Sequence, residues 1–385
     1  MRILVTTTGS AGHFGPLLPF LDAIRGAAGE VVVATRTSSV DAVAAAGYPV
    51  WPLAEAPAAE RSAIFASTRG LPPIQANERA LIGVFAGLDV HAALPGMLDA
   101  VAAWRPDMIL SEAGEFAGRL AGAHVGLPFV KVSISQYAVE HELLEQTDAA
   151  LTSIRQAHRL RPPDGGEFAH FTLMPPMLEQ PTVPGPPGIR RFRERDTRVD
   201  GQLPAHYPTG TEPLVYLTFG TVAPQREFFP DVYRAAIDAL ATLPAELLVT
   251  IGRDRDPAHL GTVPANVHVE PWVDQAIILR HASVVVCHGG SGTVRGALAH
   301  GVPLAIMPLF ADQPHNAARV HELGAGIAVT PGPAGVDELA GAVHELLGDE
   351  RYAARAALIA RDIRALPTVD TAVDVLRDHI QLART

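Results

Sequence analysis

The residues most suited to chemistry lie at 288–293, in the stretch "VVVCHGGSGTVRGALAHG", where a histidine, three glycines and two hydroxyl side chains follow an apolar run. The run predicts a buried strand, and the residues after it have a helical pattern. Glycines let backbone amides approach a ligand closely, and a helix N-terminus offers unpaired N–H donors at the positive end of its dipole. The turn therefore favours an anion, with a phosphate or diphosphate the best match. The alternative is a capped helix start whose glycines serve only tight packing.

This turn matches neither of two common nucleotide-binding motifs. It lacks the Gly-Lys-Ser/Thr of a P-loop, and Arg295 falls where a dinucleotide fingerprint needs its last glycine. A nucleoside triphosphatase and a nicotinamide dehydrogenase are therefore disfavoured. Thr221, in "TFGTV", also follows an apolar run and could supply a second contact to the anion.

His13 is a second candidate for chemistry, in the glycine-flanked loop "GSAGHFGP" after the first apolar run. The ordinary pKa of histidine, about 6.5, suits it to accept a proton near neutral pH. The same residue could instead only cap the helix that follows.

Short apolar runs alternate with longer amphipathic segments in both halves of the chain. Strands are predicted at 2–8, 30–36, 107–111, 128–133, 213–220, 245–252, 266–270, 283–290 and 302–308. Helices are predicted at 16–27, 38–46, 77–103, 113–125, 138–160, 335–348 and 350–384. This alternation predicts parallel α/β domains, which bind ligands beyond the carboxyl ends of their strands.

Residues 175–210 interrupt the pattern with many prolines and glycines, which predicts an interdomain linker. We expect a first domain over 1–205 and a second over 206–365. A C-terminal helix over 366–385 could pack back on the first domain.

Composition excludes several classes of protein. The chain of 385 residues has a formal net charge of −11, which argues against a nucleic-acid binder. Its single cysteine, Cys287, cannot form an internal disulfide. No apolar run of about 20 residues and no signal-peptide pattern is present, so we expect no membrane span and a cytoplasmic location. A homodimer is left open.

Four spaced elements in 270–316 resemble the nucleotide-sugar-binding region of glycosyltransferase family 1: Trp-x-x-Gln, His-Gly-Gly-x-Gly-Thr, Gly-Val-Pro and Asp-Gln. They are most similar to those of actinobacterial natural-product glycosyltransferases. The resemblance extends more weakly to 6–19 and 191–196 and so covers essentially the whole chain. It implies the GT-B fold, in which two Rossmann-like open α/β domains face each other across a cleft, and it implies an inverting reaction. The domain over 1–205 would bind the acceptor, and the domain over 206–365 would bind the nucleotide sugar.

The resemblance also implies a donor site. Trp272 would stack on the nucleobase, the backbone of Val273 would contact the base edge, and Asp312 with Gln313 would hydrogen-bond the sugar. The diphosphate would lie on His288, Gly290, Ser291, Gly292 and Thr293, and Gly12 and Thr221 complete the expected donor-binding set. Trp272 could instead be a core aromatic residue, and Asp312 could only cap a helix. Asp274 stands where the family often has proline.

His13 matches the general base of this family, which usually has an aspartate partner after a later strand. Glu112 stands at the matching place and is the expected catalytic partner of His13. Glu115, one helical turn later, could take that role instead, or Glu112 could only cap a helix. A carboxylate there would fix the tautomer and stabilise the imidazolium.

No metal or other cofactor is expected. Asp254 and Asp256 form an Asp-x-Asp string, but they lie in a Pro-containing loop without further ligands at a suitable spacing. Backbone donors and a helix dipole can stabilise a leaving diphosphate instead.

The expected partners are a thymidine- or uridine-diphosphate sugar and a small apolar acceptor. Phe65, Phe85 and Tyr137 are the candidate acceptor contacts, although each could be plain core. The predicted function is therefore transfer of a sugar to a hydroxyl of an apolar natural product. The alternatives are a sugar-nucleotide epimerase of the same fold and a non-catalytic partner of an active transferase.

Overall fold

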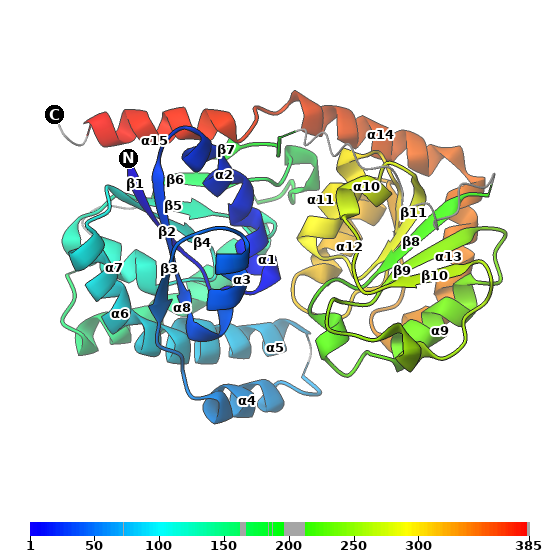
Figure 1. Cartoon of the computed structure of the whole chain (residues 1–385), viewed down its shortest axis with the longest axis horizontal. Helices are drawn as coiled ribbons and strands as arrows, with labels where there is room; N and C mark the ends of the chain where they lie inside the picture. The colour runs from blue at the N-terminus through cyan, green and yellow to red at the C-terminus, as the bar shows by residue number, and fades with distance from the viewer. Residues whose placement is uncertain (72, 162–166, 184, 187, 196–211, 383–385) are drawn as a thin grey trace. The chain divides into compact units, whose positions relative to one another are not determined.

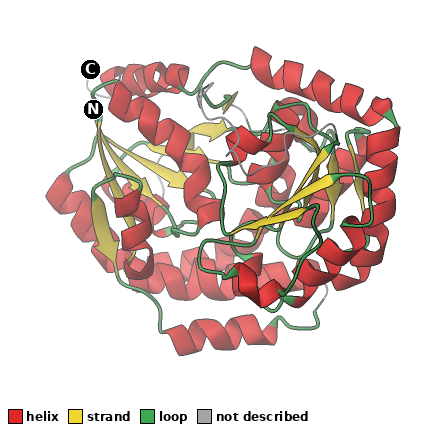
Figure 2. Cartoon of the chain, turned by 45° about the vertical axis from the view of Figure 1, so that its right-hand side comes forward, coloured by secondary structure: helices red, strands yellow, loops and turns green. Residues whose placement is uncertain are grey.

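The computed structural model describes residues 1–71, 73–161, 167–183, 185–186, 188–195 and 212–382 (Figure 1). The chain divides into two compact units. The first unit is Met1–Arg195 with Leu366–Thr385, and the second is Asp196–Ala365. Each unit has a parallel β-sheet covered by helices, as Figure 2 shows by colour. These are the two α/β domains that the alternating pattern predicts.

The sheet of the first unit has, in the described residues, seven strands in the order β3-β2-β1-β4-β5-β6-β7, and neighbouring strands pair in parallel. The strands are β1 (Arg2–Thr6), β2 (Glu30–Arg36), β3 (Val50–Leu53), β4 (Met108–Glu112), β5 (Phe129–Val132), β6 (Glu167–Thr172) and β7 (Ile189–Arg191). Alternate side chains of β1 enter two different cores, with Ile3 on one face and Leu4 on the other. Burial on both faces explains why this strand is continuously apolar.

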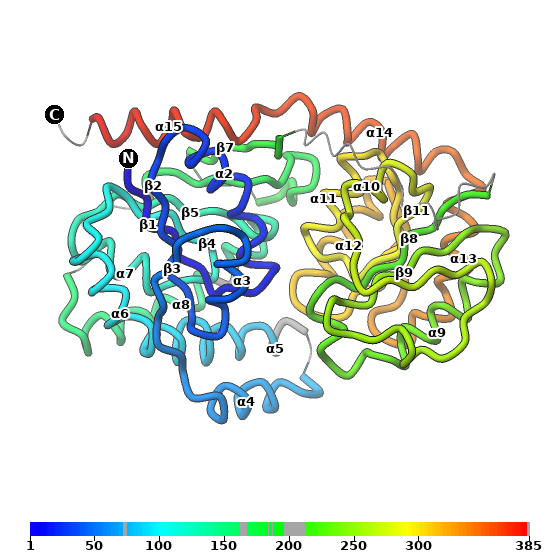
Figure 3. Tube along the Cα trace, viewed as in Figure 1, coloured from blue at the N-terminus to red at the C-terminus, as the bar shows by residue number. Residues whose placement is uncertain are grey.

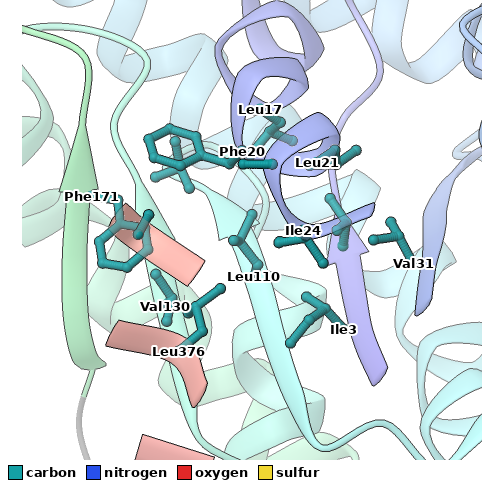
Figure 4. Packing of buried hydrophobic residues seen from close by; sticks show 14 of the residues in the cluster. Ile3, Leu17, Phe20, Leu21, Ile24, Val31, Leu110, Val130, Phe171 and Leu376 are labelled. Atoms are coloured by element: carbon teal, nitrogen blue, oxygen red, sulfur yellow. The ribbon is translucent and has the colours of Figure 1, made fainter. Parts of the chain in front are cut away.

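The helices of the first unit cover both faces of this sheet. They are α1 (Ala11–Phe14), α2 (Leu18–Gly26), α3 (Val40–Ala45), α4 (Ala58–Ser67), α5 (Pro73–Ala80), α6 (Asp89–Trp104), α7 (Ala117–Val125), α8 (Tyr137–Ala157) and α15 (Asp370–Leu382). The C-terminal helix α15 packs against α2, near the N-terminal end of the trace in Figure 3. Its Leu376 joins Val130 and Phe171 in the core cluster of Figure 4. Packing thus returns the end of the chain to the first unit.

The sheet of the second unit has six strands in the described residues, in the order β10-β9-β8-β11-β12-β13. They are β8 (Leu214–Thr218), β9 (Glu246–Thr250), β10 (Val267–Glu270), β11 (Ala282–Cys287), β12 (Leu304–Ile306) and β13 (Gly326–Ala328). The helices are α9 (Asp231–Leu240), α10 (Gln275–Ile278), α11 (Ser291–Ala299), α12 (Gln313–Glu322), α13 (Val336–Gly348) and α14 (Glu350–Ala365).

The structure differs from the predicted elements mainly at sheet edges and at helix breaks. The edge strands β3, β7 and β13 were missed, because short strands of three or four residues give little periodic signal. β6 and α4 were also missed. The helix expected over 350–384 is two helices, since Pro367 follows the end of α14 and cannot continue it.

The Pro-rich segment 175–210 is not linker over its whole length. Residues Ile189–Arg191 form β7, which pairs with β6, and Phe192 is 3% exposed in the core of the first unit. The linker prediction therefore began too early, and its part over 196–210 lies outside the described residues.

One helical stretch, 73–104, is longer than predicted and changes geometry inside. A π-helical segment, η3 (Leu81–Leu88), joins α5 to α6. By length and composition alone, Gln75–Trp104 would pass as a membrane span, the one such helix in the described residues, with 39% of its apolar window buried. Core helices of globular proteins pass the same test, and Val90 and Leu94 of this stretch lie in a core of the first unit.

Strand order decides which loops meet at the carboxyl edge of each sheet. β1 pairs with β4 in the first unit, so the loops that carry His13 and Glu112 start side by side. β8 pairs with β11 in the second unit, with Thr218 opposite Cys287, which brings the loop of Thr221 beside the glycine turn.

Candidate active site

His13 and Glu112 contact each other at the carboxyl edge of the first sheet. His13 lies in the short helix α1, and its Nδ1 is 2.9 Å from Oε1 of Glu112. The Glu112 side chain is fully buried, whereas the imidazole is 22% exposed. The pair therefore combines a buried carboxylate with a base that solutes can reach.

Backbone amides hold the Glu112 carboxylate in place. The amide of Thr8 donates to Oε1 at 3.0 Å, and the amide of Gly114 donates to Oε2 at 2.5 Å. Burial alone would raise the pKa of Glu112, but the charge of His13 and these hydrogen bonds together hold that pKa below its ordinary value. The group is therefore an anion at neutral pH, as a partner that stabilises an imidazolium must be.

Glu115 has a different task. Its carboxylate accepts hydrogen bonds from the amides of Ala117 at 2.8 Å and Gly118 at 2.9 Å, in the first turn of α7. Burial is the main reason that the pKa of Glu115 is raised. Of the two carboxylates left open by the sequence, the structure thus places Glu112 on His13 and Glu115 on the helix start.

The three candidate acceptor residues lie in different places of the first unit. Phe85 lies in η3 and stacks on the His13 ring, with 5.7 Å between ring centroids and 12° between planes. Phe65 is half-buried in α4, which packs against η3. Tyr137 begins α8, and its ring stacks on that of His141 at 5.4 Å. Only Phe85 of these three is brought onto the candidate base by a ring contact that the described residues show.

The glycine turn of the second unit leaves the start of α11 open. Gly290 is the N-cap residue and makes no side-chain cap, and the first helical hydrogen bond runs from the amide of Val294 to the carbonyl of Gly290. In the described part of the chain, the amides of Ser291, Gly292 and Thr293 have no hydrogen-bond acceptor. Three open amides at the positive end of a helix have the donors and the charge that suit an anion.

A polar network holds this turn against α12. Asn316, which is 3% exposed, donates from its amide group to the carbonyl of Gly289 at 2.9 Å and to Oδ2 of Asp312 at 3.0 Å. The Ser291 hydroxyl donates to the same Asp312 oxygen at 2.8 Å. Sequence reasoning assigned no role to Asn316; its signal was the spacing of four from Asp312, which puts both on one side of a helix start.

His288 is neutral in this environment. Burial lowers the pKa of His288 to about 4, although the charge of Asp312 and a hydrogen bond to the Thr218 backbone oppose the shift. Gly220 and Gly290 leave room for the ring, because an added Cβ would lie 2.8 Å and 2.5 Å from Nε2 respectively. The exposed Thr221 directly follows Gly220, so the structure brings it to the same edge.

Trp272 is 49% exposed, so it is not a core residue. The guanidinium of Arg253 lies over its ring, 3.8 Å from the centroid. Val273 beside it is buried, and Asp274 caps α10 by accepting from the amide of Ala276 at 3.0 Å. Asp274 therefore has a structural role at the position where the family often has proline. The contact of Arg253 with the indole was not predicted from the sequence.

Gln313 and Gly12, two further expected site residues, differ in their exposure to solvent. Gln313 is 2% exposed, and its Oε1 accepts from the amides of Leu309 at 2.8 Å and Phe310 at 2.9 Å, so this oxygen shapes a loop. Gly12 is exposed in α1, with nothing within 4 Å of an added Cβ.

The Asp-x-Asp string lies in a loop after β9. Asp256 accepts from the amide of Ala258 at 2.9 Å and caps a short 3₁₀ helix, and Asp254 is exposed. In the residues that the structure describes, no three His, Cys, Asp or Glu side chains are grouped as a metal site would need.

The known proteins that this chain is similar to include proteins of antibiotic biosynthesis. Residues 234–378 match the family model described as the C-terminal domain of the erythromycin biosynthesis protein CIII-like proteins. Over 393 residues the chain is 30% identical to the elloramycin glycosyltransferase ElmGT of Streptomyces olivaceus. The matched region covers 95% of this chain and 94% of ElmGT.

Solved structures show the same fold. The glycosyltransferase SnogD from Streptomyces nogalater has a TM-score of 0.78 at 24% identity and covers 99% of both chains. The spinosyn rhamnosyltransferase SpnG complexed with thymidine diphosphate has a TM-score of 0.80 at 22% identity, over 98% of this chain and 100% of that chain.

Proposed function

This chain belongs to the actinobacterial antibiotic glycosyltransferases of the GT-B fold, and from that premise we propose the reaction that it catalyses. It moves a sugar from a nucleoside diphosphate to a hydroxyl of an apolar natural product, with inversion at the anomeric carbon. The family and the fold are the ones that the sequence predicted.

The observation that carries this proposal is the pair of His13 and Glu112. Because Nδ1 faces the buried carboxylate at 2.9 Å, the other ring nitrogen, Nε2, is the one that takes a proton. The acceptor hydroxyl gives its proton to Nε2 while its oxygen forms the bond to the anomeric carbon. The bond from that carbon to the diphosphate breaks, and its electron pair leaves with the diphosphate. Attack from the face opposite the leaving group inverts the configuration.

The glycine turn supports the role of a diphosphate site. The open amides of Ser291, Gly292 and Thr293 would donate to the leaving group, on which negative charge grows. His288 is neutral at physiological pH, so it contributes a dipole and an N–H rather than a charge. These groups would stabilise the leaving diphosphate without an ion, and we propose a reaction that needs no metal.

Trp272 supports a nucleotide donor. An aromatic ring that is half open to solvent suits the stacking of a nucleobase. A thymidine- or uridine-diphosphate sugar fits this proposal, and the thymidine diphosphate held by the structural relative SpnG favours the thymidine form.

Two variants test the assignment of donor and base. Trp272→Ala should abolish the quenching of tryptophan fluorescence by thymidine diphosphate, whereas His13→Ala should bind donor like the wild type and lose transfer to a polyketide acceptor. Transfer by His13→Ala at the wild-type rate would refute the assignment of His13 as the base.

Loss of activity with a chelator, restored by magnesium, would refute the metal-free reaction. Conversion of the donor sugar without acceptor would point to the epimerase alternative.

A further inference from the structure

The imidazole of His13 is held by more than its carboxylate partner. The ring of Phe85 stacks on it at 5.7 Å with planes only 12° apart. On its edge lies Gly114, where an added Cβ would come within 2.8 Å of Cε1 and 3.2 Å of Nδ1 of His13. An aromatic face and a missing side chain therefore border the same ring that Glu112 binds.

Such contacts are needed because a single hydrogen bond does not fix the plane of a histidine ring. The χ2 torsion of histidine joins an sp³ to an sp² carbon, and its energy profile is broad. The contact of Nδ1 with Glu112 sets the position of one nitrogen, yet it permits rotation about that contact. A stacked ring restricts this rotation, because turning the imidazole breaks the parallel packing.

The backbone around Phe85 is π-helical, and its neighbouring side chains are buried. Phe85 lies within the π-helical segment η3, a geometry that is rare in proteins and frequent at functional sites. Its neighbours Val84 and Ala86 are fully buried in a core, so the segment has little freedom to move.

We propose that Phe85 and Gly114 are positioning residues for His13: the phenyl ring fixes the plane of the imidazole, and the absent side chain of Gly114 leaves room for its edge. Nε2 is thereby directed to the reacting hydroxyl while Nδ1 stays on Glu112. This inference rests on the proposed function, and it replaces the expectation that Phe85 serves only as an apolar contact for the acceptor.

The test uses the full chain and two kinds of measurement. The proton resonance on Cε1 of His13, assigned by its loss in His13→Gln, reports the ring environment without any substrate. Steady-state kinetics then separate kcat from the KM of the acceptor. The variants are Phe85→Leu, Phe85→Tyr and Gly114→Ala. Phe168→Leu is the matched control, since it removes another phenyl–imidazole stack, with His379, between β6 and α15.

We expect Phe85→Leu to shift the His13 resonance and to lower kcat about tenfold while the acceptor KM changes little. Phe85→Tyr keeps the ring and should restore both values. Gly114→Ala should shift the resonance and lower kcat by up to about a hundredfold, because its Cβ displaces the ring. Phe168→Leu should leave the His13 resonance and kcat at their wild-type values.

A different pattern would overturn the inference. If Phe85→Leu raised only the KM of the acceptor and left the His13 resonance in place, Phe85 would be a wall of the acceptor site. An unmoved resonance in a folded Gly114→Ala would remove Gly114 from the scheme. A wild-type protein without transferase activity would refute the proposed function instead, while the resonance would still decide whether Phe85 and Gly114 hold the ring.

Discussion

The hydroxyl of Ser291 donates a hydrogen bond to the carboxylate of Asp312 at a distance of 2.8 Å. The two residues are expected to bind different parts of a sugar nucleotide, yet they bind each other. The Ser291 hydroxyl proton is therefore directed to Asp312. We expect Ser291 to contact an anion through its backbone amide instead.

Ser291→Ala should consequently cost little donor affinity. The variant keeps the amide of residue 291, and Asp312 keeps its contact with Asn316. We expect the dissociation constant for thymidine diphosphate, measured by titration calorimetry, to rise less than tenfold. A larger rise would mean that the hydroxyl itself contacts the phosphates.

Asn316→Ala should lower the stability of the fold more than Ser291→Ala does. It leaves the carbonyl of Gly289 without its donor in a buried place, which costs about 1–3 kcal/mol in the free energy of unfolding. Urea denaturation measures this loss. If Asn316→Ala were no less stable than Ser291→Ala, the network would not hold the turn as we infer.

Two glycines of the turn should separate folding from binding. Gly289 has a φ of +88°, and an added Cβ would lie 2.8 Å from Cγ2 of Ile306, so Gly289→Ala should lose more than about 1 kcal/mol of stability. Nothing lies within 4 Å of a Cβ at Gly292. Gly292→Ala should therefore fold like the wild type and bind thymidine diphosphate more weakly, because the methyl group occupies space for the ligand. Unchanged affinity in Gly292→Ala would place the diphosphate elsewhere.

Glu112 and Glu115 should affect the pH dependence of stability in opposite directions. The pKa of Glu112 is lowered, so its stabilisation is complete above its ordinary value of 4.5 and is lost as the pH falls through the lower pKa of the folded chain. The pKa of Glu115 is raised, so its stabilisation is complete below 4.5 and is lost as the pH rises through the higher pKa. Glu112→Gln should thus be most destabilising at neutral pH, and Glu115→Gln at acidic pH. Urea unfolding of both variants at the two pH values checks this, and parallel behaviour would contradict it.

Trp272 and Arg253 should contribute to donor affinity by different amounts. Loss of the indole in Trp272→Ala removes base stacking, which is worth about 1–3 kcal/mol per base. Arg253→Met keeps an unbranched chain over the ring but removes the cation, and we expect a loss of about 0.5–1 kcal/mol that does not vanish at high salt. Calorimetric titration with thymidine diphosphate measures both. Equal affinity of Trp272→Ala and the wild type would end the stacking proposal.

Strands at the centre of the sheets were predicted from the sequence, whereas several short strands at the edges were missed. Central strands such as β1 and β11 are buried on both faces, so their apolar runs were recognised directly. The edge strand β3 contains Pro52 and is only four residues long, and β7 lies in a Pro-rich stretch, so both looked like loop. Local composition indicates burial, and an edge strand is buried less.

The sequence by itself determined the class of fold and the place of the glycine turn between β11 and α11, because alternating periodicity and a glycine-rich strand-to-helix junction are local properties. Only the tertiary structure decided that Glu112, and not Glu115, meets His13, that Phe85 lies on the same ring, and that Arg253 covers Trp272. These contacts join residues that are separated along the chain, and Glu112 follows His13 by 99 positions. The order in which strands pair brings such residues together, and no local pattern encodes that order.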